Sequence, residues 1–148
     1  MLPANSPKYT ILFAVMADRI APDCVGLDVL YVRLDDNGIV TVELNSGVDF
    51  TLEAARQYVD ACVRLCNGTP RPFLIIEPAH PFESSPEVRE FLAQNTSLRT
   101  LRKALAIVAG DFPNRLAAKA YLNFNKPVEH GRLFSKQEDA IAWLKHYL

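Results

Sequence analysis

The sequence predicts an α/β domain with a mixed, mostly parallel sheet of five strands and four helices. Three observations predict this fold: a hairpin pattern around residue 37, two apolar runs typical of strands buried on both faces, and helical periodicities between the strands. The expected order is β-β-α-β-α-β-α-β-α in residues 27–148, behind an N-terminal extension of residues 1–26. Such alternation favours parallel strands joined by right-handed crossovers, with the first hairpin strand antiparallel.

The composition bounds the class of protein without naming an activity. A chain of 148 residues suits one domain of ordinary size. Its 16 Lys and Arg against 17 Asp and Glu give a net charge of −1, which argues against a dedicated nucleic-acid binder. Hydrophobic residues make up 49% and charged residues 22%, as in a folded globular protein.

Cysteine usage and hydropathy indicate a cytoplasmic protein without a metal or other cofactor. Three cysteines are too few, and odd in number, for a disulfide framework, and Cys62 and Cys66 fall on the apolar face of a predicted helix. The histidines are scattered singly. No apolar run reaches the ~18 residues that span a bilayer. Tyr9–Ala17 is similar to the apolar part of a signal peptide, but Lys8 is the only basic side chain before it and Asp18 follows directly.

The hairpin pattern opens the predicted domain. Leu30–Leu34 and Val40–Leu44 alternate apolar and polar residues on either side of Asp36-Asn37-Gly38. Asn-Gly supplies the two residues of positive φ that a type I′ turn requires, so we expect a tight two-residue turn here. Upstream, Tyr9–Met16 would be an exposed apolar patch in water, so the extension should pack on the domain or on a neighbouring subunit.

Capping signals and apolar spacing place the helices. Thr51 is a predicted N-cap, and Asn67-Gly68 ends the first helix. Ser84–Glu87 is a predicted capping box for the second helix, and Asp111 opens the third. Ser135 and Glu138 form a predicted capping box for the last helix. The residues expected to face inward are Leu52, Ala55, Val59, Cys62 and Cys66; Val88, Phe91 and Leu92; Leu116, Ala117, Ala120, Tyr121 and Phe124; and Ala140, Ile141, Leu144, Tyr147 and Leu148.

The remaining strands come from short apolar runs. Phe73–Ile76 and Ala104–Ala109 are apolar on both alternating sides, which is typical of strands covered on both faces. Arg132–Phe134 is a short last strand. The basic residues Arg99, Arg102 and Lys103 precede the second buried strand, and we expect a solvated turn there. The alternative is contact with an acidic partner or a phosphate.

The C-terminal third carries a family resemblance. Its motifs are Asn123-Phe124-Asn125-Lys126-Pro127, Arg132-Leu133-Phe134-Ser135, Glu138-Asp139-Ala140 and Trp143-Leu144-Lys145. With weaker matches at 35–38, 51–55 and 85–89, the chain resembles uncharacterised bacterial STAS-like proteins, which are relatives of the anti-sigma-factor antagonists and include STAS/SEC14 domain proteins. The resemblance covers about residues 28–148. It implies a STAS-like fold and brings no catalytic residues.

A candidate binding site lies at the carboxyl edge of the predicted sheet, where ligands bind in open α/β folds. The loops expected there contribute Glu77, His80, Glu83, Asp111 and Asn114. The anti-sigma antagonists carry a regulatory phosphoserine at the start of the helix after this strand. By position, the resemblance implies Ser84 or Ser85 as its counterpart, and the plainer alternative is that one of them only caps the helix.

Catalysis is not expected at this edge. His80, Glu83 and Ser84 are the residue types of a hydrolase triad, but no Gly-x-Ser-x-Gly elbow is present, and sequence neighbours rarely reach triad geometry. Neither glycine-rich phosphate-binding motif occurs.

Two functions therefore remain open. The first is a non-enzymatic STAS-like regulatory or protein-interaction domain, expected to bind a protein partner and to form a homodimer. The alternative is a carrier or sensor of a small apolar or anionic, lipid-like ligand of the SEC14-like kind. A buried cavity of several hundred Å³ with few polar groups would favour the alternative, and a solid core would count against it.

Overall fold

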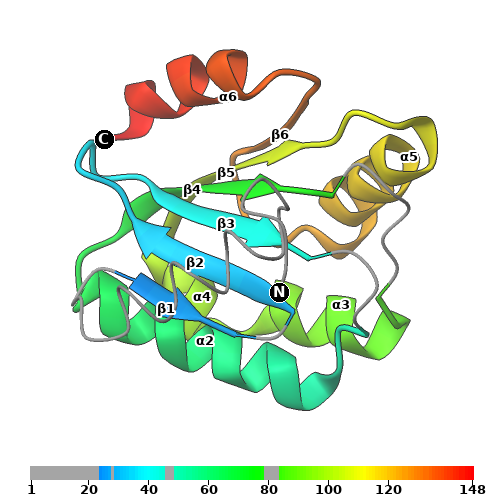
Figure 1. The fold of residues 1–148 in the computed structure, drawn as a ribbon, viewed down its shortest axis with the longest axis horizontal. Coiled ribbons are helices and arrows are strands. Elements are labelled where there is room, and N and C mark those ends of the chain that lie inside the picture. Colours follow the sequence, from blue (N-terminus) through cyan, green and yellow to red (C-terminus); the bar gives the residue numbers. More distant parts are fainter. Residues whose placement is uncertain (1–23, 28, 46–48, 79–83) are drawn as a thin grey trace, which may run out of the picture.

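The computed structural model describes residues 24–27, 29–45, 49–78 and 84–148. Within them, six strands form one sheet in the order β1-β2-β3-β4-β5-β6 (Figure 1). The strands are β1 (Cys24–Gly26), β2 (Leu30–Leu34), β3 (Val40–Leu44), β4 (Arg71–Ile76), β5 (Arg102–Val108) and β6 (Gly131–Phe134). The helices are α2 (Leu52–Cys66), α3 (Pro86–Gln94), α4 (Thr96–Leu101), α5 (Phe112–Ala120) and α6 (Gln137–Leu144). A π-helical turn, η1 (Tyr121–Asn125), continues α5, and a 3-10 turn, η2 (Lys145–Tyr147), follows α6.

The predicted fold class is confirmed, with one strand and one helix more than expected in the described residues. The additional strand, β1, lies in the last three residues of the predicted extension and pairs antiparallel with β2. The additional helix is α4, which follows the second predicted helix, α3, after the single residue Asn95. Asn95 ends α3 and caps α4, since its Oδ1 accepts a hydrogen bond from Leu98 N at 3.0 Å. The mixed character is as predicted: β1, β2 and β3 are antiparallel neighbours, and β3 to β6 are parallel.

The strand order explains which face each helix covers. From β3 onward, each new strand is added beside the one before it, always on the same side, so the sheet grows in one direction from β3 to β6. Right-handed crossovers that keep one direction place their helices on one face of the sheet. Figure 1 shows α2, α3 and α4 together on that face and α6 on the other. The last helix follows β6 rather than connecting two strands, so it is free to cover the second face.

Two apolar clusters hold these layers together. The larger joins the sheet to α2, α3, α4 and α5, and its most buried sheet residues include Val32, Val42, Phe73 and Leu105. The smaller lies beneath α6; it consists of Ile39, Leu74, Ala104, Ala106, Ala140 and Leu144. The central strands β4 and β5 contribute to both clusters, which confirms that they are covered on both faces.

The hairpin forms as predicted, but the predicted type of turn is wrong. Asp35 N donates to Ile39 O at 2.9 Å, so the loop between the strands has three residues. Only Gly38 has a positive φ, of 88°, and Asn37 is not in the left-handed region. Gly38 N donates to Asp35 O at 2.9 Å, and Asn37 Oδ1 accepts from Ile39 N at 3.0 Å. This is the three-residue hairpin with a glycine bulge, which also needs glycine at its last position.

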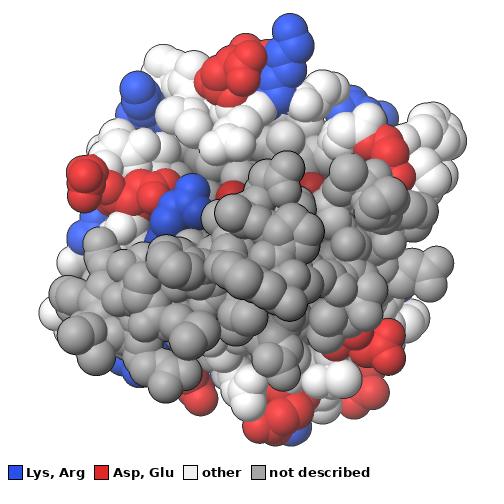
Figure 2. Space-filling model, in the orientation of Figure 1, with Lys and Arg blue, Asp and Glu red and all other residues white. Residues whose placement is uncertain are grey.

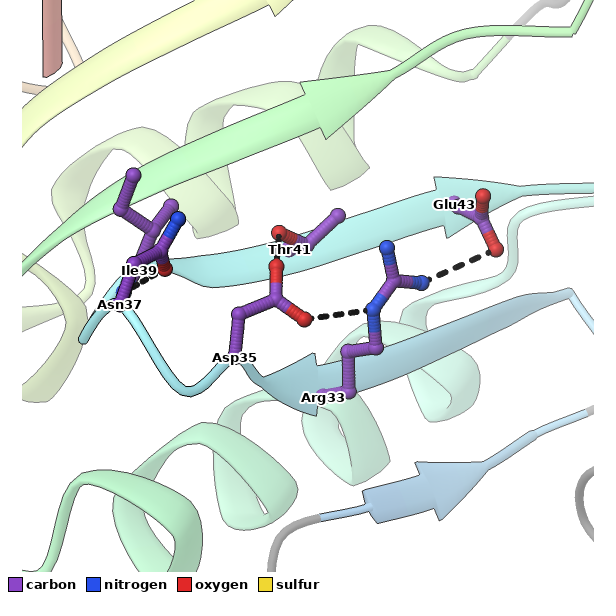
Figure 3. A network of polar contacts seen from close by, with 6 residues as sticks. All are labelled: Arg33, Asp35, Asn37, Ile39, Thr41 and Glu43. Carbon is purple, nitrogen blue, oxygen red and sulfur yellow. Dashed lines mark hydrogen bonds and ion pairs between the residues drawn. The ribbon is translucent and has the colours of Figure 1, made fainter. Parts of the chain in front are cut away.

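A polar network joins the two strands of this hairpin (Figure 3). Arg33 Nε lies 2.7 Å from Asp35 Oδ1, and Arg33 Nη1 lies 3.3 Å from Glu43 Oε2. The Thr41 hydroxyl donates to the second carboxylate oxygen of Asp35 at 2.5 Å. Asp35 therefore accepts from both strands at once, and it links the end of β2 to the start of β3.

Two of the predicted helix caps are confirmed and two are wrong. Thr51 caps α2 by accepting from Ala54 N at 3.1 Å, and Asp111 caps α5 by accepting from Asn114 N at 3.3 Å. The cap of α3 is Ser85 rather than Ser84, because Pro86 is the first helical residue and Ser85 Oγ accepts from Val88 N. Lys136 precedes α6 and makes no side-chain cap, since the Ser135 hydroxyl instead accepts from Arg115 Nη1 at 2.5 Å.

The predicted inward face of α5 is also wrong in part. Leu116 is 60% exposed and Phe124 is 84% exposed, while Asn114 and Ala118 are buried. The Asn114 amide nitrogen donates to Pro78 O at 3.2 Å, which fixes the rotation of the helix. Leu148, at the end of the chain, is exposed as well.

The structure also bears on the cysteines, on metal binding and on membrane spans. Cys62 and Cys66 are buried and unpaired, as predicted, and Cys24 is the first residue of β1. Among the described residues, no three His, Cys, Asp or Glu side chains are grouped to hold a metal ion. No helix in this part of the chain is long and apolar enough to cross a bilayer. On the face in Figure 2, basic and acidic side chains of the described residues lie interspersed.

Asp35→Ala should lower the free energy of unfolding by about 1–3 kcal/mol, because Arg33 and Thr41 both lose their shared acceptor. Urea denaturation measures this loss. The matched control is Asp36→Ala at the exposed neighbouring position, where a change within about 0.5 kcal/mol is expected. Equal losses in the two variants would contradict a structural role for the network.

Candidate functional site

A cavity of about 300 Å³ lies in the larger cluster, between the sheet and the helices α2, α3 and α5. Its walls are mostly apolar, and six polar or ionisable side chains interrupt them. The apolar lining comes from Leu30, Val42, Leu44, Phe50, Ile75, Leu92, Ile107, Ala117 and Ala118. The polar lining comes from Tyr58, Glu77, Ser84, Arg89, Arg102 and Tyr121. A concave apolar site with a few polar groups is the usual form of a small-molecule pocket.

Arg102 reaches this cavity because of an irregularity between β4 and β5. Arg71 pairs with Arg102, but the next residue, Pro72, pairs with Ala104, so Lys103 is one extra residue in β5. Leu105 and Ile107 face the cluster of α2, so simple alternation would turn Lys103 toward it and Arg102 away. The extra residue reverses this, and Arg102 is 5% exposed while Lys103 is exposed. Pro72 has no N–H to donate, which explains a bulge within a central strand.

The buried guanidinium has no anionic partner in the described part of the chain. Arg102 Nε and Nη1 are buried without a hydrogen bond, and so is the Tyr58 hydroxyl. No ion pair joins Arg102 to a carboxylate among these residues. Its guanidinium carbon lies 5.6 Å from the centre of the Phe73 ring, a cation–π contact that supplies only part of the lost hydration.

The groups around Arg102 are neutral. Burial raises the pKa of Tyr58 far above its ordinary value, and burial raises the pKa of the Cys62 thiol to about 12. Burial alone would lower the pKa of Arg102, but the charge attraction of Tyr58 and Tyr121 and a side-chain contact with Tyr58 raise it, and the net shift is upward. The guanidinium keeps its charge, and the raised pKa values of Tyr58 and Cys62 leave these two neighbours neutral at pH 7. A buried, unpaired charge of this kind costs several kcal/mol.

Glu77 lies at the opposite end of the cavity, directly after β4. Its burial, and secondarily the nearby Asp111, raise the pKa of this carboxyl to about 7. Arg89 and Ser84 line the same end, and an Arg89 nitrogen donates to Ser84 O. The carboxyl is therefore close to half protonated at neutral pH.

The predicted candidate residues fall into three groups. Glu77 and Ser84 line the cavity. Asp111, Asn114 and Ser85 do not line it; Asp111 and Ser85 are N-caps, and Asn114 ties α5 to Pro78. His80 and Glu83 lie outside the described residues. Phosphorylation of Ser84 or Ser85, and binding at the edge residues, stay predictions.

The predicted edge is nevertheless assembled in space. Phe50 and Ser84 form an isolated parallel bridge between the loops that follow β3 and β4. Glu77 N donates to Val108 O at 3.0 Å, and Ala109 N donates to Phe134 O at 3.1 Å, so the carboxyl ends of β4, β5 and β6 stay in step.

Sequence reasoning missed the side chain that gives the cavity its charge. The expected solvated turn at Arg99, Arg102 and Lys103 is wrong for Arg102, which is buried. No pattern in the sequence marks Tyr58 or Arg89 as a site residue, and the apolar spacing predicts Tyr121 only as an inward-facing residue. One signal was present: Pro72, beside the run 73–76, is rare in a central strand unless a bulge accommodates it.

The chain matches one family model over residues 32–148, with the description domain of unknown function, DUF7793. The chain belongs to this family. Its structure is similar to that of an uncharacterised protein of the DUF3478 family from Shewanella loihica PV-4, which has a SpoIIAA-like fold. The TM-score is 0.55 at 17% identity, covering 78% of this chain and 91% of the other. No curated protein matches the sequence.

These comparisons confirm the resemblance and the fold that it implies. A SpoIIAA-like fold is the STAS-like fold of the anti-sigma-factor antagonists, and the similar structure has that fold. At 17% identity, the similarity establishes the fold alone.

Glu77→Gln should flatten the dependence of stability on pH. The pKa of Glu77 is higher in the folded chain than its ordinary value of 4.5, so the folded state binds more protons between about pH 4.5 and 7. Wild-type stability should therefore fall as the pH rises through this range, by on the order of 2 kcal/mol. The variant should lack this fall and should be the more stable protein at pH 8.

Urea denaturation at pH 5, 6, 7 and 8 measures the effect. Glu87→Gln removes the same charge at an exposed position of α3 and should keep the wild-type slope. If Glu77→Gln kept that slope as well, Glu77 would not be the group responsible.

Proposed function

We propose that this domain binds a small amphipathic anion in the cavity, with Arg102 as its counter-ion. One observation carries the proposal: a buried guanidinium with two unpartnered nitrogens lines an otherwise mostly apolar cavity. The proposed role is that of a carrier or sensor of a ligand rather than of an enzyme.

The energetics of the unliganded site support an anionic ligand. A buried arginine without a partner destabilises the fold, and replacing such a charge by an apolar residue of similar size is often stabilising. An anion inside the cavity would supply the missing charge and accept from the free donors of Arg102, in a setting where charge-assisted hydrogen bonds are strong. The apolar walls contributed by Leu30, Ile75 and Ile107 suit a hydrocarbon tail.

The volume limits the size of the ligand. If each non-hydrogen atom takes the ~30 Å³ of a liquid water, about 300 Å³ holds roughly ten such atoms. Octanoate has a carboxylate and a saturated tail of this size, so it is a suitable probe, and 1-octanol and octylammonium are its neutral and cationic counterparts.

Octanoate should bind to the wild-type domain and raise its melting temperature, 1-octanol should bind more weakly, and octylammonium should not bind. Arg102→Met should weaken octanoate binding by about thirtyfold or more, because the buried counter-charge is lost. Without ligand, this variant should be at least as stable as the wild type. Isothermal titration calorimetry and thermal unfolding measure these effects.

Lys103→Met is the matched control, because it removes the neighbouring basic charge at an exposed position. It should leave octanoate binding unchanged. Equal affinity of the wild type and Arg102→Met for octanoate, or no binding by the wild type, would refute the assignment of Arg102.

A protein-interaction role is the second candidate. The observation that favours it is an exposed apolar ridge on α5 and η1, made of Phe112 (75% exposed), Leu116 and Phe124. Exposed apolar patches mark interaction sites in folded proteins. The occupant that we propose is a second copy of the chain, in line with the homodimer expected from the sequence.

If the ridge is the dimer contact, the double variant Phe112→Ser, Phe124→Ser should shift the protein from dimer to monomer. Both side chains are exposed, so the fold should tolerate the change. Sedimentation velocity measures the assembly state. A wild type that is monomeric at high concentration would exclude this candidate.

A further inference from the structure

The two ends of the cavity carry different chemistry, and the strand register gives the distance between them. Arg102 pairs with Arg71 at the start of β4, and Glu77 follows that strand six positions further on. At ~3.3 Å per residue, the two backbones are about 20 Å apart along the sheet. The side chains of Arg102 and Glu77 both line the cavity, so the distance between their charged groups, which a ligand would have to bridge, is shorter than the distance between the backbones.

The wall between the two ends offers no polar partner from the sheet. Leu30, Val42, Leu44, Ile75 and Ile107 line it. A ligand lying along the strands would therefore meet polar groups of the sheet only at its two ends. One end offers the donors of Arg102, and the other offers the carboxyl of Glu77.

The Glu77 carboxyl is available to a ligand within the described part of the chain. No hydrogen bond or ion pair engages its side chain there, although its backbone N–H donates to Val108 O at 3.0 Å. The Arg89 guanidinium lines the same end but is not within ion-pair distance of Glu77, and one of its nitrogens donates to Ser84 O. Glu77, Ser84 and Arg89 are partly buried, whereas Arg102 and Tyr58 at the other end are buried.

We infer that the ligand carries a hydroxyl group at the end opposite its acidic group, and that Glu77 binds this hydroxyl. The inference rests on the proposed function. The ligand class is then an ω-hydroxy carboxylic acid or a close equivalent.

Three terminal groups can be compared on chemical grounds. A second carboxylate would be attracted by Arg89, but the ionised form of Glu77 and the nearby Asp111, which already contributes to the raised pKa of Glu77, would repel it. An ammonium group would need ionised Glu77 and would face Arg89 at the same end. A hydroxyl both donates and accepts, so it can bond to the protonated and to the ionised carboxyl.

The test compares matched ligands on the full chain at pH 7 by isothermal titration calorimetry. In the wild type, 8-hydroxyoctanoate should bind about tenfold tighter than octanoate, because it gains one hydrogen bond. Octanedioate should bind more weakly than octanoate. The pair 10-hydroxydecanoate and decanoate repeats the comparison, so that the result does not depend on one chain length.

Variants assign the preference to Glu77. Glu77→Leu should bind octanoate at least as tightly as the wild type and should lose the preference for the hydroxyl. Glu77→Gln keeps a hydrogen-bonding group of the same size and should retain part of that preference. Glu87→Gln, an exposed control on α3, should retain all of it. Circular dichroism and thermal unfolding establish that each variant is folded.

The outcomes separate the two proposals. If octanoate binds in an Arg102-dependent way and neither hydroxy acid binds tighter than its parent acid, the second polar contact is refuted and the proposed function stands. A hydroxyl preference that survives Glu77→Leu also refutes the role of Glu77. If none of the acids binds, the proposed function fails, and this inference fails with it.

Discussion

The bulge between β4 and β5 determines the chemistry of the interior. One extra residue, Lys103, changes the alternation of β5, so that Arg102 rather than Lys103 turns toward α2. Without it, alternation would turn Lys103 toward the cavity and Arg102 away from it. The position of Pro72 beside this irregularity gives it a local cause, since a proline in a central strand leaves a gap in the ladder.

The cavity itself follows from the winding of the chain. Three connections place helices on one face of the sheet. The cavity lies between the sheet and the helices α2, α3 and α5, where Ala117 and Ala118 line it with small side chains. On the other face, α6 packs on Ala104 and Ala106, whose small side chains allow close contact. The same sheet therefore has one tightly packed face and one face with room for a ligand.

Stability and the proposed ligand binding oppose each other at Arg102. Its burial without an anionic partner destabilises the unliganded fold. The network around Asp35 on the hairpin is the opposite case, because each charged group there has a partner nearby. The Asp35 network, whose donors and acceptors are paired, holds β2 and β3 together. The Arg102 guanidinium has two unpaired nitrogens, which could donate to the proposed ligand.

The sequence by itself determined the fold class, the hairpin, the ends of α2 and the double burial of β4 and β5, because each follows from local spacing or from a cap next to its helix. It also indicated the sheet edge that contains Glu77 and Ser84. It did not determine the rotation of α5, which depends on the bond from Asn114 to Pro78, or the cap of α6, since Arg115 engages the Ser135 hydroxyl. Arg102 and Lys103 are adjacent basic residues that no local pattern distinguishes. Only the pairing with β4, a contact between residues distant in sequence, decided which of them is buried.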